Sequence, residues 1–339
     1  MANLNIINLS DLSADWHWLR DEFKHLPNAW AHYTSLNSRL PKRLPKRQSI
    51  ARFMAATQAV LDAKKQPSLL VSHGPRPSYY GARMAQHLHP QLPHLAYSFN
   101  FTDLPSGFQH KAMTKAYQQI DRFVVYSTLE KKLYADYFGI APERIDMLHW
   151  SVHAPTVPHN EPPIEQGDYI CALGSQGRDY ETLFAAMRAL PHIRLVVVAT
   201  ADSVQHLSVP ENVTVRTHIP LAHAHNILTH SRFMVVPLRD SQVPCGHVTI
   251  VSGMFFQKAM LVTNSEGVHD YIQDHATGLY FAPKERQDLT QKIQQLWDDR
   301  ALTQQLATAG YAFAQAHCSE QNVVRYFSDY LHQLQHQLP

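Results

Sequence analysis

The sequence predicts an α/β protein with two doubly wound, Rossmann-like domains, each built on a parallel sheet. Three observations lead to this fold class. Short runs rich in β-branched residues alternate with longer segments of helical period, which is typical of parallel strands joined by crossover helices. The length of 339 residues suits two domains of roughly 150 residues each. A polar, proline-rich segment interrupts the alternation near the middle of the chain.

The first domain is expected to span residues 1–152. Its strands are predicted at 4–9, 69–72, 94–99, 122–126 and 145–149, with helices filling most of the gaps between them. A linker is expected at 153–167, because the run through Glu161-Pro162-Pro163 cannot sustain the hydrogen bonding of a helix or a sheet.

The second domain is expected at 168–318. Its strands are predicted at 169–173, 194–199, 213–217, 233–237, 260–263 and 278–281. The pattern from 284 onward is nearly all helical, and we expect the last helix, at 319–339, to cross back and pack on the first domain.

The composition indicates a folded protein without a membrane span. Hydrophobic residues make up 45% of the chain and charged residues 17%. No run approaches eighteen apolar residues, and the N-terminus lacks the pattern of a signal peptide, so we expect a cytoplasmic protein. The three cysteines are far apart and form no CxxC pair, and no convincing Asp-x-Asp pair is present, so no disulfide framework and no metal site are predicted.

Charge is distributed unequally between the two halves. Residues 1–152 carry 18 Lys and Arg against 11 Asp and Glu, whereas the remainder carries 12 against 17. Such asymmetry indicates that the halves meet different partners, and the basic half is expected to meet something anionic.

A glycine-containing turn follows the first strand of the second domain. Gly174 and Gly177 come after that strand, and Arg178 precedes an amphipathic run at 181–190. Glycines let a backbone approach an anion, a helix N-terminus offers N–H groups, and an arginine can donate two hydrogen bonds to a phosphate. The turn is a candidate phosphate site, with a plain glycine turn and a solvated Arg178 as the alternative.

A second strand–turn–helix junction repeats these features. Gly246, His247, Val248 and Thr249 stand between the strand at 233–237 and a helix at 250–257. Gly246 can approach a diphosphate, and the next three residues can offer N–H groups and a hydroxyl, although His247 as a surface cap is the plainer alternative. Because open α/β sheets bind ligands at the carboxyl ends of strands, two such junctions indicate a nucleotide diphosphate.

The order of these segments resembles the donor-binding domain of family 4 glycosyltransferases, which have the GT-B fold of two Rossmann-like domains facing across a cleft. The resemblance begins at Phe123-Val-Val-Tyr-Ser127, continues through His149-Trp150-Ser151-Val152 and reaches about Phe281. It implies a hexosyltransferase that moves a sugar from a UDP- or GDP-sugar to a glycan, glycolipid or small-molecule acceptor. It also implies retention of the anomeric configuration, no metal, and no cofactor other than the nucleotide-sugar as co-substrate.

The sequence departs from this family at its signature positions. Two glutamates separated by seven residues, one near the transferred sugar and one on the ribose, are expected in the donor loop, and they fall on Pro244 and Ser252. Ser252 is therefore a donor-side candidate, and Arg178 stands near the family's diphosphate-binding lysine. Since cations and N–H dipoles stabilise a departing diphosphate, Arg178 and Thr249 are expected to assist the reaction.

Polar residues follow two strands of the first domain. His73 and Arg76 come after the strand at 69–72, and Asn100 comes after the strand at 94–99. The family often has a histidine near the position of Asn100, so we name His73 and Asn100 as the catalytic candidates and Arg76 as an acceptor-side candidate. With 23 histidines in the chain, a purely structural His73 is the alternative.

The densest basic run extends from Arg39 to Arg47 and is followed by Arg52. Its cations Lys42, Arg43, Lys46 and Arg47 belong to the half expected to bind the acceptor. Peripheral contact with an anionic inner membrane face is one interpretation, because each basic residue near such a leaflet contributes about 1 kcal/mol. The alternative is a solvated loop, since the run contains two prolines and no long amphipathic helix is expected around it.

Two other functions fit parts of this pattern. A UDP-sugar epimerase of the same fold would need acidic catalytic residues. A non-catalytic nucleotide-sugar-binding protein would explain the missing glutamates. Nucleic acid is not an expected partner, because the basic run lacks interleaved aromatic residues.

Overall fold

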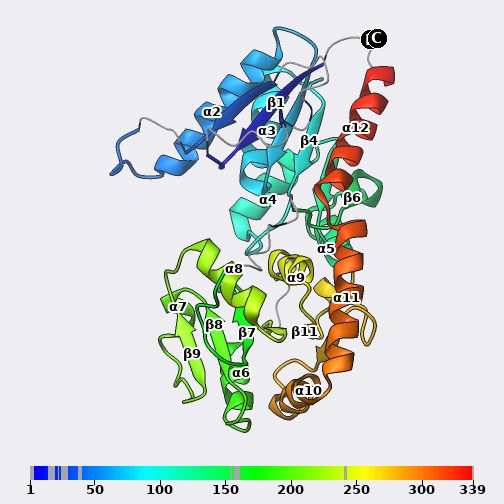
Figure 1. Cartoon of the computed structure of the whole chain (residues 1–339). Coiled ribbons are helices and arrows are strands. Elements are labelled where there is room, and N and C mark those ends of the chain that lie inside the picture. Colours follow the sequence, from blue (N-terminus) through cyan, green and yellow to red (C-terminus); the bar gives the residue numbers. More distant parts are fainter. Residues whose placement is uncertain are drawn as a thin grey trace. The chain divides into compact units, whose positions relative to one another are not determined.

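The computed structural model describes residues 4–13, 20, 21, 23, 30–36, 40–152, 155, 161–239 and 243–337. It contains two compact units (Figure 1). Unit 1 comprises Met1–Leu148 and Val323–Pro339, and unit 2 comprises His149–Asn322. Arg39 and residues 153, 154 and 156–160 of the predicted linker lie outside the described residues.

Unit 1 is built on a six-stranded parallel sheet. The strands have the order β2-β1-β3-β4-β5-β6 across the sheet. They are β1 (Asn5–Ser10), β2 (Trp30–Thr34), β3 (Ser68–His73), β4 (His94–Tyr97), β5 (Arg122–Val125) and β6 (Ile145–Met147). After β1 the chain adds β2 on one side of it, and from β3 onward it adds strands on the other side. The direction in which strands are added therefore reverses between β1 and β3.

Helices cover both faces of this sheet. Alternate residues of β1 point to opposite faces, so Ile6 packs with α12 while Ile7 packs with α2 and α3. The helices of unit 1 are α2 (Arg47–Ala63), α3 (Pro75–Leu88), α4 (Gly107–Tyr117), α5 (Thr128–Phe138), the 3-10 turn η1 (Pro142–Arg144) and α12 (Glu320–Gln337). Val323 and Phe327 of α12 lie in the core of unit 1, as expected for the last helix.

Unit 2 contains a second six-stranded parallel sheet, in the order β12-β11-β10-β7-β8-β9. The strands are β7 (Ile170–Leu173), β8 (Leu195–Val198), β9 (Val213–Arg216), β10 (Met234–Val236), β11 (Met260–Thr263) and β12 (Leu279–Phe281). From β7 the chain adds β8 and β9 on one side, and β10 to β12 then extend the other side. This is the Rossmann strand order, with its change of direction between β7 and β10.

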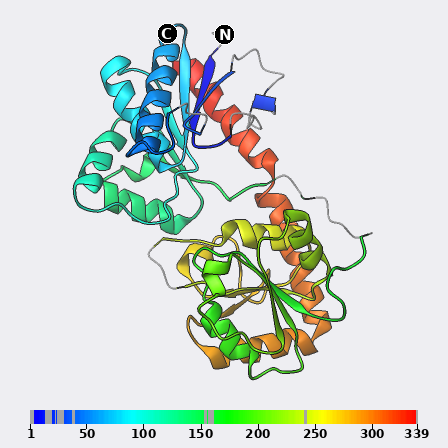
Figure 2. The same cartoon turned by 90° about the vertical axis from the view of Figure 1, so that its left-hand side faces the viewer.

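Helices cover both faces of the sheet of unit 2 (Figure 2), and buried apolar side chains form a layer on each face. Ile170 and Val235 pack against α6 and α10, whereas Cys171 and Met234 pack against α8 and α9. The helices are α6 (Tyr180–Met187), α7 (Ala201–Val204), α8 (Leu221–His230), α9 (His247–Phe255), the 3-10 turn η2 (Glu266–Val268), α10 (Arg286–Asp298) and α11 (Arg300–His317). None of the described helices is long and apolar enough to cross a bilayer.

The fold class predicted from the sequence is confirmed. Each of the predicted strands is present, with ends that agree to within two residues. The prediction missed β2, which lies at the edge of the first sheet and is half-buried along its whole length. An edge strand of this kind lacks the continuous apolar run that marks the buried strands.

Candidate functional site

The switch point of the second sheet brings the two glycine junctions to one edge. β7 and β10 are hydrogen-bonded neighbours in register at Cys171 and Met234. The turn with Gly174 and Gly177 follows β7, and the segment leading to Gly246 follows β10. Because the carboxyl ends of parallel strands lie at the same edge, both junctions border the crevice where such sheets bind ligands.

Both glycines of the first junction are required by its geometry. Gly174 has φ of +104°, and a Cβ added there would lie 2.6 Å from Arg178 Nη2. Gly177 has φ of +65°, and a Cβ there would lie 2.5 Å from Cys245 Sγ. The turn therefore needs residues that adopt positive φ and carry no side chain. It ends at Asp179, whose carboxylate caps α6 by accepting from Thr182 N at 3.1 Å.

Arg178 is turned into the protein, with only 5% of its surface exposed. Its guanidinium donates to Leu173 O at 3.3 Å, to Gln176 O at 2.8 Å and to Thr249 Oγ1 at 2.7 Å. The interpretation of Arg178 as a solvated first-turn residue is therefore wrong. Burial lowers the pKa of Arg178, which nevertheless stays protonated because an arginine begins from a very high pKa.

The described partners of Arg178 are all neutral. Within the described part of the chain, its hydrogen bonds go to two carbonyl oxygens and one hydroxyl, and no carboxylate pairs with it. A buried cation is costly unless an anion compensates it. The site has the electrostatic character of a receptor for an anionic ligand.

The second junction begins α9 with a left-handed glycine. Gly246 has φ of +95° and is the N-cap, and the first helical bond of α9 runs from Ile250 N to Gly246 O at 2.9 Å. The amides of His247, Val248 and Thr249 have no acceptor within the helix, so they give this end partial positive charge. Val248 is half exposed, whereas Thr249 and the predicted donor-side residue Ser252 are partly buried.

The side chain of His247 supports the loop that follows β11. Its Nε2 lies 2.8 Å from Gly267 O, and its ring stacks on Tyr271 with the centroids 4.8 Å apart. The residue is buried, so its interpretation as a surface cap is wrong. Burial lowers its pKa, which keeps the ring neutral at pH 7. His247 can contribute its backbone N–H to a ligand, while its side chain is engaged inside the unit.

Hydrogen bonds and close packing join the two junctions into one structure. Arg239 N donates to Gly177 O and Asp179 N donates to Pro237 O, each at 2.9 Å. Arg178 and Thr249 form the side-chain link between them. Pro244 packs so closely on Gly267 that a Cβ added to Gly267 would lie 2.4 Å from Pro244 Cβ.

In unit 1, His73 lies at the end of β3 with its ring buried. Its Nε2 is 3.2 Å from Asn8 Oδ1, and its ring packs edge-on against Tyr97 with 5.6 Å between the centroids. Burial, with a smaller effect of His32, lowers the pKa of His73 to about 3, so this histidine is neutral at pH 7. These contacts favour the structural interpretation of His73, and its catalytic role stays a prediction.

The other predicted residues of unit 1 are exposed, except for the partly buried Arg47. Asn100 follows β4, and its backbone N donates to Ser98 O at 2.9 Å. Arg76 lies in the first turn of α3. Lys42, Arg43 and Lys46 are exposed in the segment before α2, and Arg47, whose Nε donates to Leu40 O at 3.0 Å, begins that helix.

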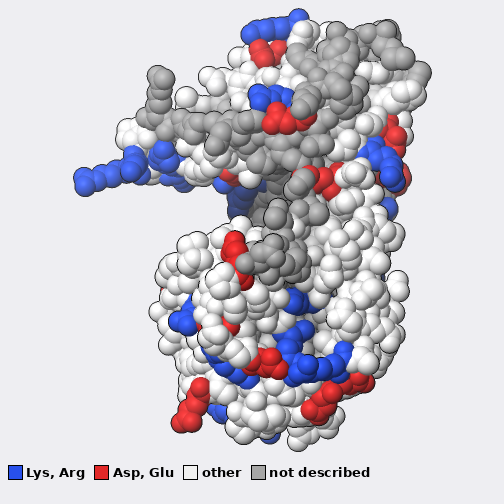
Figure 3. All heavy atoms as spheres, in the orientation of Figure 1, with Lys and Arg blue, Asp and Glu red and all other residues white. Residues whose placement is uncertain are grey.

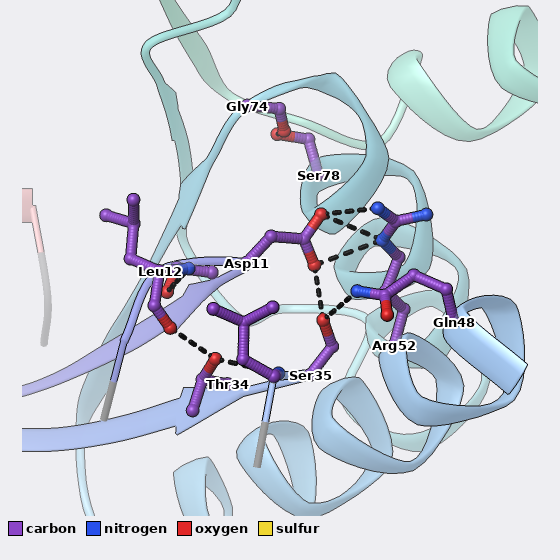
Figure 4. Close-up of polar contacts among 10 residues, drawn as sticks. Asp11, Leu12, Thr34, Ser35, Gln48, Arg52, Gly74 and Ser78 are labelled. Atoms are coloured by element: carbon purple, nitrogen blue, oxygen red, sulfur yellow. Dashed lines mark hydrogen bonds and ion pairs between the residues drawn. The ribbon is translucent and has the colours of Figure 1, made fainter. Parts of the chain in front are cut away.

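A polar cluster that the sequence did not reveal lies at the carboxyl ends of β1 and β2 (Figure 4). The carboxylate of Asp11 accepts from Arg52 Nε at 2.8 and 3.0 Å, and Arg52 Nη2 lies 2.6 Å from it. Ser35 Oγ donates to the same carboxylate at 2.6 Å and accepts from Gln48 Nε2, also at 2.6 Å. Recognising the cluster required β2, which the prediction lacked, because Ser35 follows that strand.

Comparison with known proteins agrees with this geometry. Residues 169–299, which carry both glycine junctions, match the model of the family Glycosyl transferases group 1. Sucrose-phosphate synthase from Thermosynechococcus elongatus is similar in structure, with a TM-score of 0.75, 14% identity and coverage of 99% of this chain and 100% of that one. Anabaena HepE in complex with UDP has a TM-score of 0.73, 12% identity and coverage of 98% and 100%.

This chain has the GT-B fold. The resemblance predicted from the sequence is thereby confirmed at the level of the fold and of the Glycosyl transferases group 1 match. A trehalose-phosphate synthase (UDP-forming) from Burkholderia vietnamiensis is also similar, with a TM-score of 0.72, 10% identity and full coverage of both chains. No curated protein sequence matches significantly. Among the described residues of this chain, no cluster of His, Cys, Asp or Glu could hold a metal ion.

Proposed function

We propose that this protein is a glycosyltransferase that binds the diphosphate of a nucleotide-sugar at the β7–β10 edge of unit 2. The observation that carries the proposal is the buried guanidinium of Arg178, which has neutral partners and lies beside the N-terminus of α9. Structures of the similar Anabaena HepE hold UDP, UDP with glucose, and UDP-glucose. These complexes favour a UDP-sugar as the donor, with a GDP-sugar as the alternative.

The chemistry of sugar transfer fits this edge. Cleavage of the bond between the anomeric carbon and the diphosphate leaves negative charge on the departing group. Arg178 would compensate this charge from inside the turn, and the amides of Val248 and Thr249 would donate hydrogen bonds from the start of α9. The resemblance to family 4 implies a retaining transfer without a metal, and we propose the same for this chain.

The acceptor is proposed to bind to unit 1. The Asp11–Arg52 pair supports this assignment, because both side chains are partly exposed at the carboxyl ends of β1 and β2. Asn100 is exposed after β4 and remains a candidate for contact with the acceptor. A buried and neutral His73 would hold Asn8 and Tyr97 in place and would act on the acceptor side through them.

Donor turnover tests the proposed function. The full chain is incubated with UDP-, GDP-, ADP- and dTDP-sugars and a panel of glycan, glycolipid and small-molecule acceptors, while release of nucleotide diphosphate and thermal stability are followed. We expect one donor to raise the melting temperature and to be consumed in the presence of an acceptor. Binding without turnover across the whole panel would favour a non-catalytic protein, and the absence of binding would refute the donor site.

A further inference from the structure

The strongest unassigned feature of unit 1 is the solvent-facing side of α2. Ile50, Phe53, Met54 and Leu61 are 37%, 48%, 48% and 47% exposed, although all four are large and apolar. At 100° per residue these positions fall within an arc of about 100° on one side of the helix. Together with Thr57, which lies between Met54 and Leu61 on the same side, they form a mainly apolar stripe, here called the α2 stripe. The stripe corrects the expectation that no long amphipathic helix surrounds the basic run.

The opposite side of α2 is fully committed to the fold. Small residues at Ala51, Ala55, Ala56, Ala59 and Ala63 are buried and allow close packing against the neighbouring elements. Arg52 is anchored to Asp11. Because these contacts fix the orientation of the helix, the α2 stripe cannot turn inward without breaking the core of unit 1.

Cations bracket the α2 stripe at both ends. Lys42, Arg43, Lys46 and Arg47 precede it, and Lys64 and Lys65 follow it. From 40 to 65 the chain contains seven basic residues and a single acidic one, Asp62, which pairs with Lys65 at 2.7 Å. Figure 3 shows Lys and Arg side chains projecting at its left edge, where the segment leading into α2 lies in Figure 1.

We propose that the α2 stripe and its flanking cations dock unit 1 on an anionic lipid surface. An amphipathic helix that lies in the headgroup region buries its apolar side chains at the edge of the acyl chains, while Lys and Arg reach the lipid phosphates. The two features reinforce each other, since the apolar side chains insert only where the cations hold the helix. A protein partner for the same stripe would not need cations at both of its ends. The proposal is independent of the donor site, which lies in unit 2.

Vesicle binding by the full chain provides the test. The protein is sedimented with two kinds of vesicle, one of phosphatidylcholine alone and one of phosphatidylcholine with about 30% phosphatidylglycerol. At this share of anionic lipid the negative surface potential is strong enough to hold basic residues. We expect binding to the anionic vesicles, little binding to the neutral ones, and loss of binding as salt increases, because salt screens the cations.

Two variants separate the contributions of the stripe and the cations. Phe53→Ser with Met54→Ser should lower the partition coefficient about 10- to 100-fold, since two half-exposed apolar side chains no longer insert. The partition coefficient should fall about 100-fold in the triple variant Lys42→Ala, Arg43→Ala, Lys46→Ala, because each cation contributes a factor of about 5. All of these side chains are exposed, so thermal unfolding should change little.

Matched controls on the same unit test specificity. Phe108→Ser removes a side chain that is 87% exposed on α4, and Lys111→Ala, Lys115→Ala and Lys132→Ala together remove three cations from α4 and α5. Both should bind anionic vesicles like the unchanged protein. The proposal is overturned if the unchanged protein does not bind, or if the controls lose as much binding as the α2 variants. It is also overturned if the Phe53 and Met54 changes abolish self-association in sedimentation velocity but leave vesicle binding intact.

Discussion

Replacing Arg178 tests the donor site most directly. Arg178→Ala removes the buried cation together with its hydrogen bonds to Leu173, Gln176 and Thr249. A charge-assisted hydrogen bond to a diphosphate contributes about 1.5–3 kcal/mol, so the affinity for UDP should fall about 10- to 150-fold. Isothermal titration calorimetry with UDP measures this change without requiring the acceptor.

Stability has to be separated from binding in this experiment. Three internal hydrogen bonds of about 1 kcal/mol each are lost, while the cost of burying an uncompensated charge is relieved, so the net loss in unfolding free energy should stay below about 3 kcal/mol. Arg178→Lys keeps the charge but not the planar fork, and its UDP affinity should be intermediate.

Arg232 supplies the matched control in the same unit. It lies just before β10, at the opposite end of that strand from Gly246, and its guanidinium packs 4.0 Å from the centre of the Trp297 ring. Arg232→Ala should therefore reduce stability and leave UDP affinity unchanged. If Arg178→Ala reduces stability but binds UDP like the unchanged protein, Arg178 only supports the turn, and the proposed role in diphosphate binding is wrong.

Two further predictions concern unit 1. Burial raises the pKa of Glu130 to about 7 from its ordinary 4.5. The contribution of this group to stability is therefore greatest below pH 4.5 and falls by roughly 3 kcal/mol between pH 4.5 and pH 7. Glu130→Gln should remove that part of the pH dependence in urea unfolding at pH 5 and pH 8, and identical pH profiles for the two proteins would contradict the assignment. Asp11→Asn breaks the ion pair with Arg52 and should cost about 1 kcal/mol of stability. It should also lower the rate of sugar transfer while leaving the affinity for UDP unchanged. An unchanged transfer rate would show that the Asp11 cluster does not contribute to acceptor binding.

The sequence alone determined the features that depend on local pattern. β-Branched runs marked the strands of both sheets because buried parallel strands are apolar along their length. Gly174, Gly177 and Gly246 were identified because positive φ and close approach are properties of the residue type, whatever its surroundings. The two strand–turn–helix junctions therefore followed from the order of residues.

Only the tertiary structure decided which side chains are available at those positions. The burial of Arg178, His247 and His73 depends on neighbours contributed by segments that are distant in the chain, as in the contact between Arg178 and Thr249, 71 residues apart. The polar cluster around Asp11 includes Ser35, which follows β2, an edge strand without a strong pattern of its own.

The α2 stripe also shows how the sequence and the tertiary structure contribute different information. Periodicity in the sequence can place Phe53 and Met54 on one side of a helix, but an apolar side normally faces the core. Packing of Ala55 and Ala59 against unit 1 leaves the larger side chains in solvent. The assembled core decides which face of an amphipathic helix is buried, because small residues allow closer packing than large ones. The sequence pattern alone does not determine that choice.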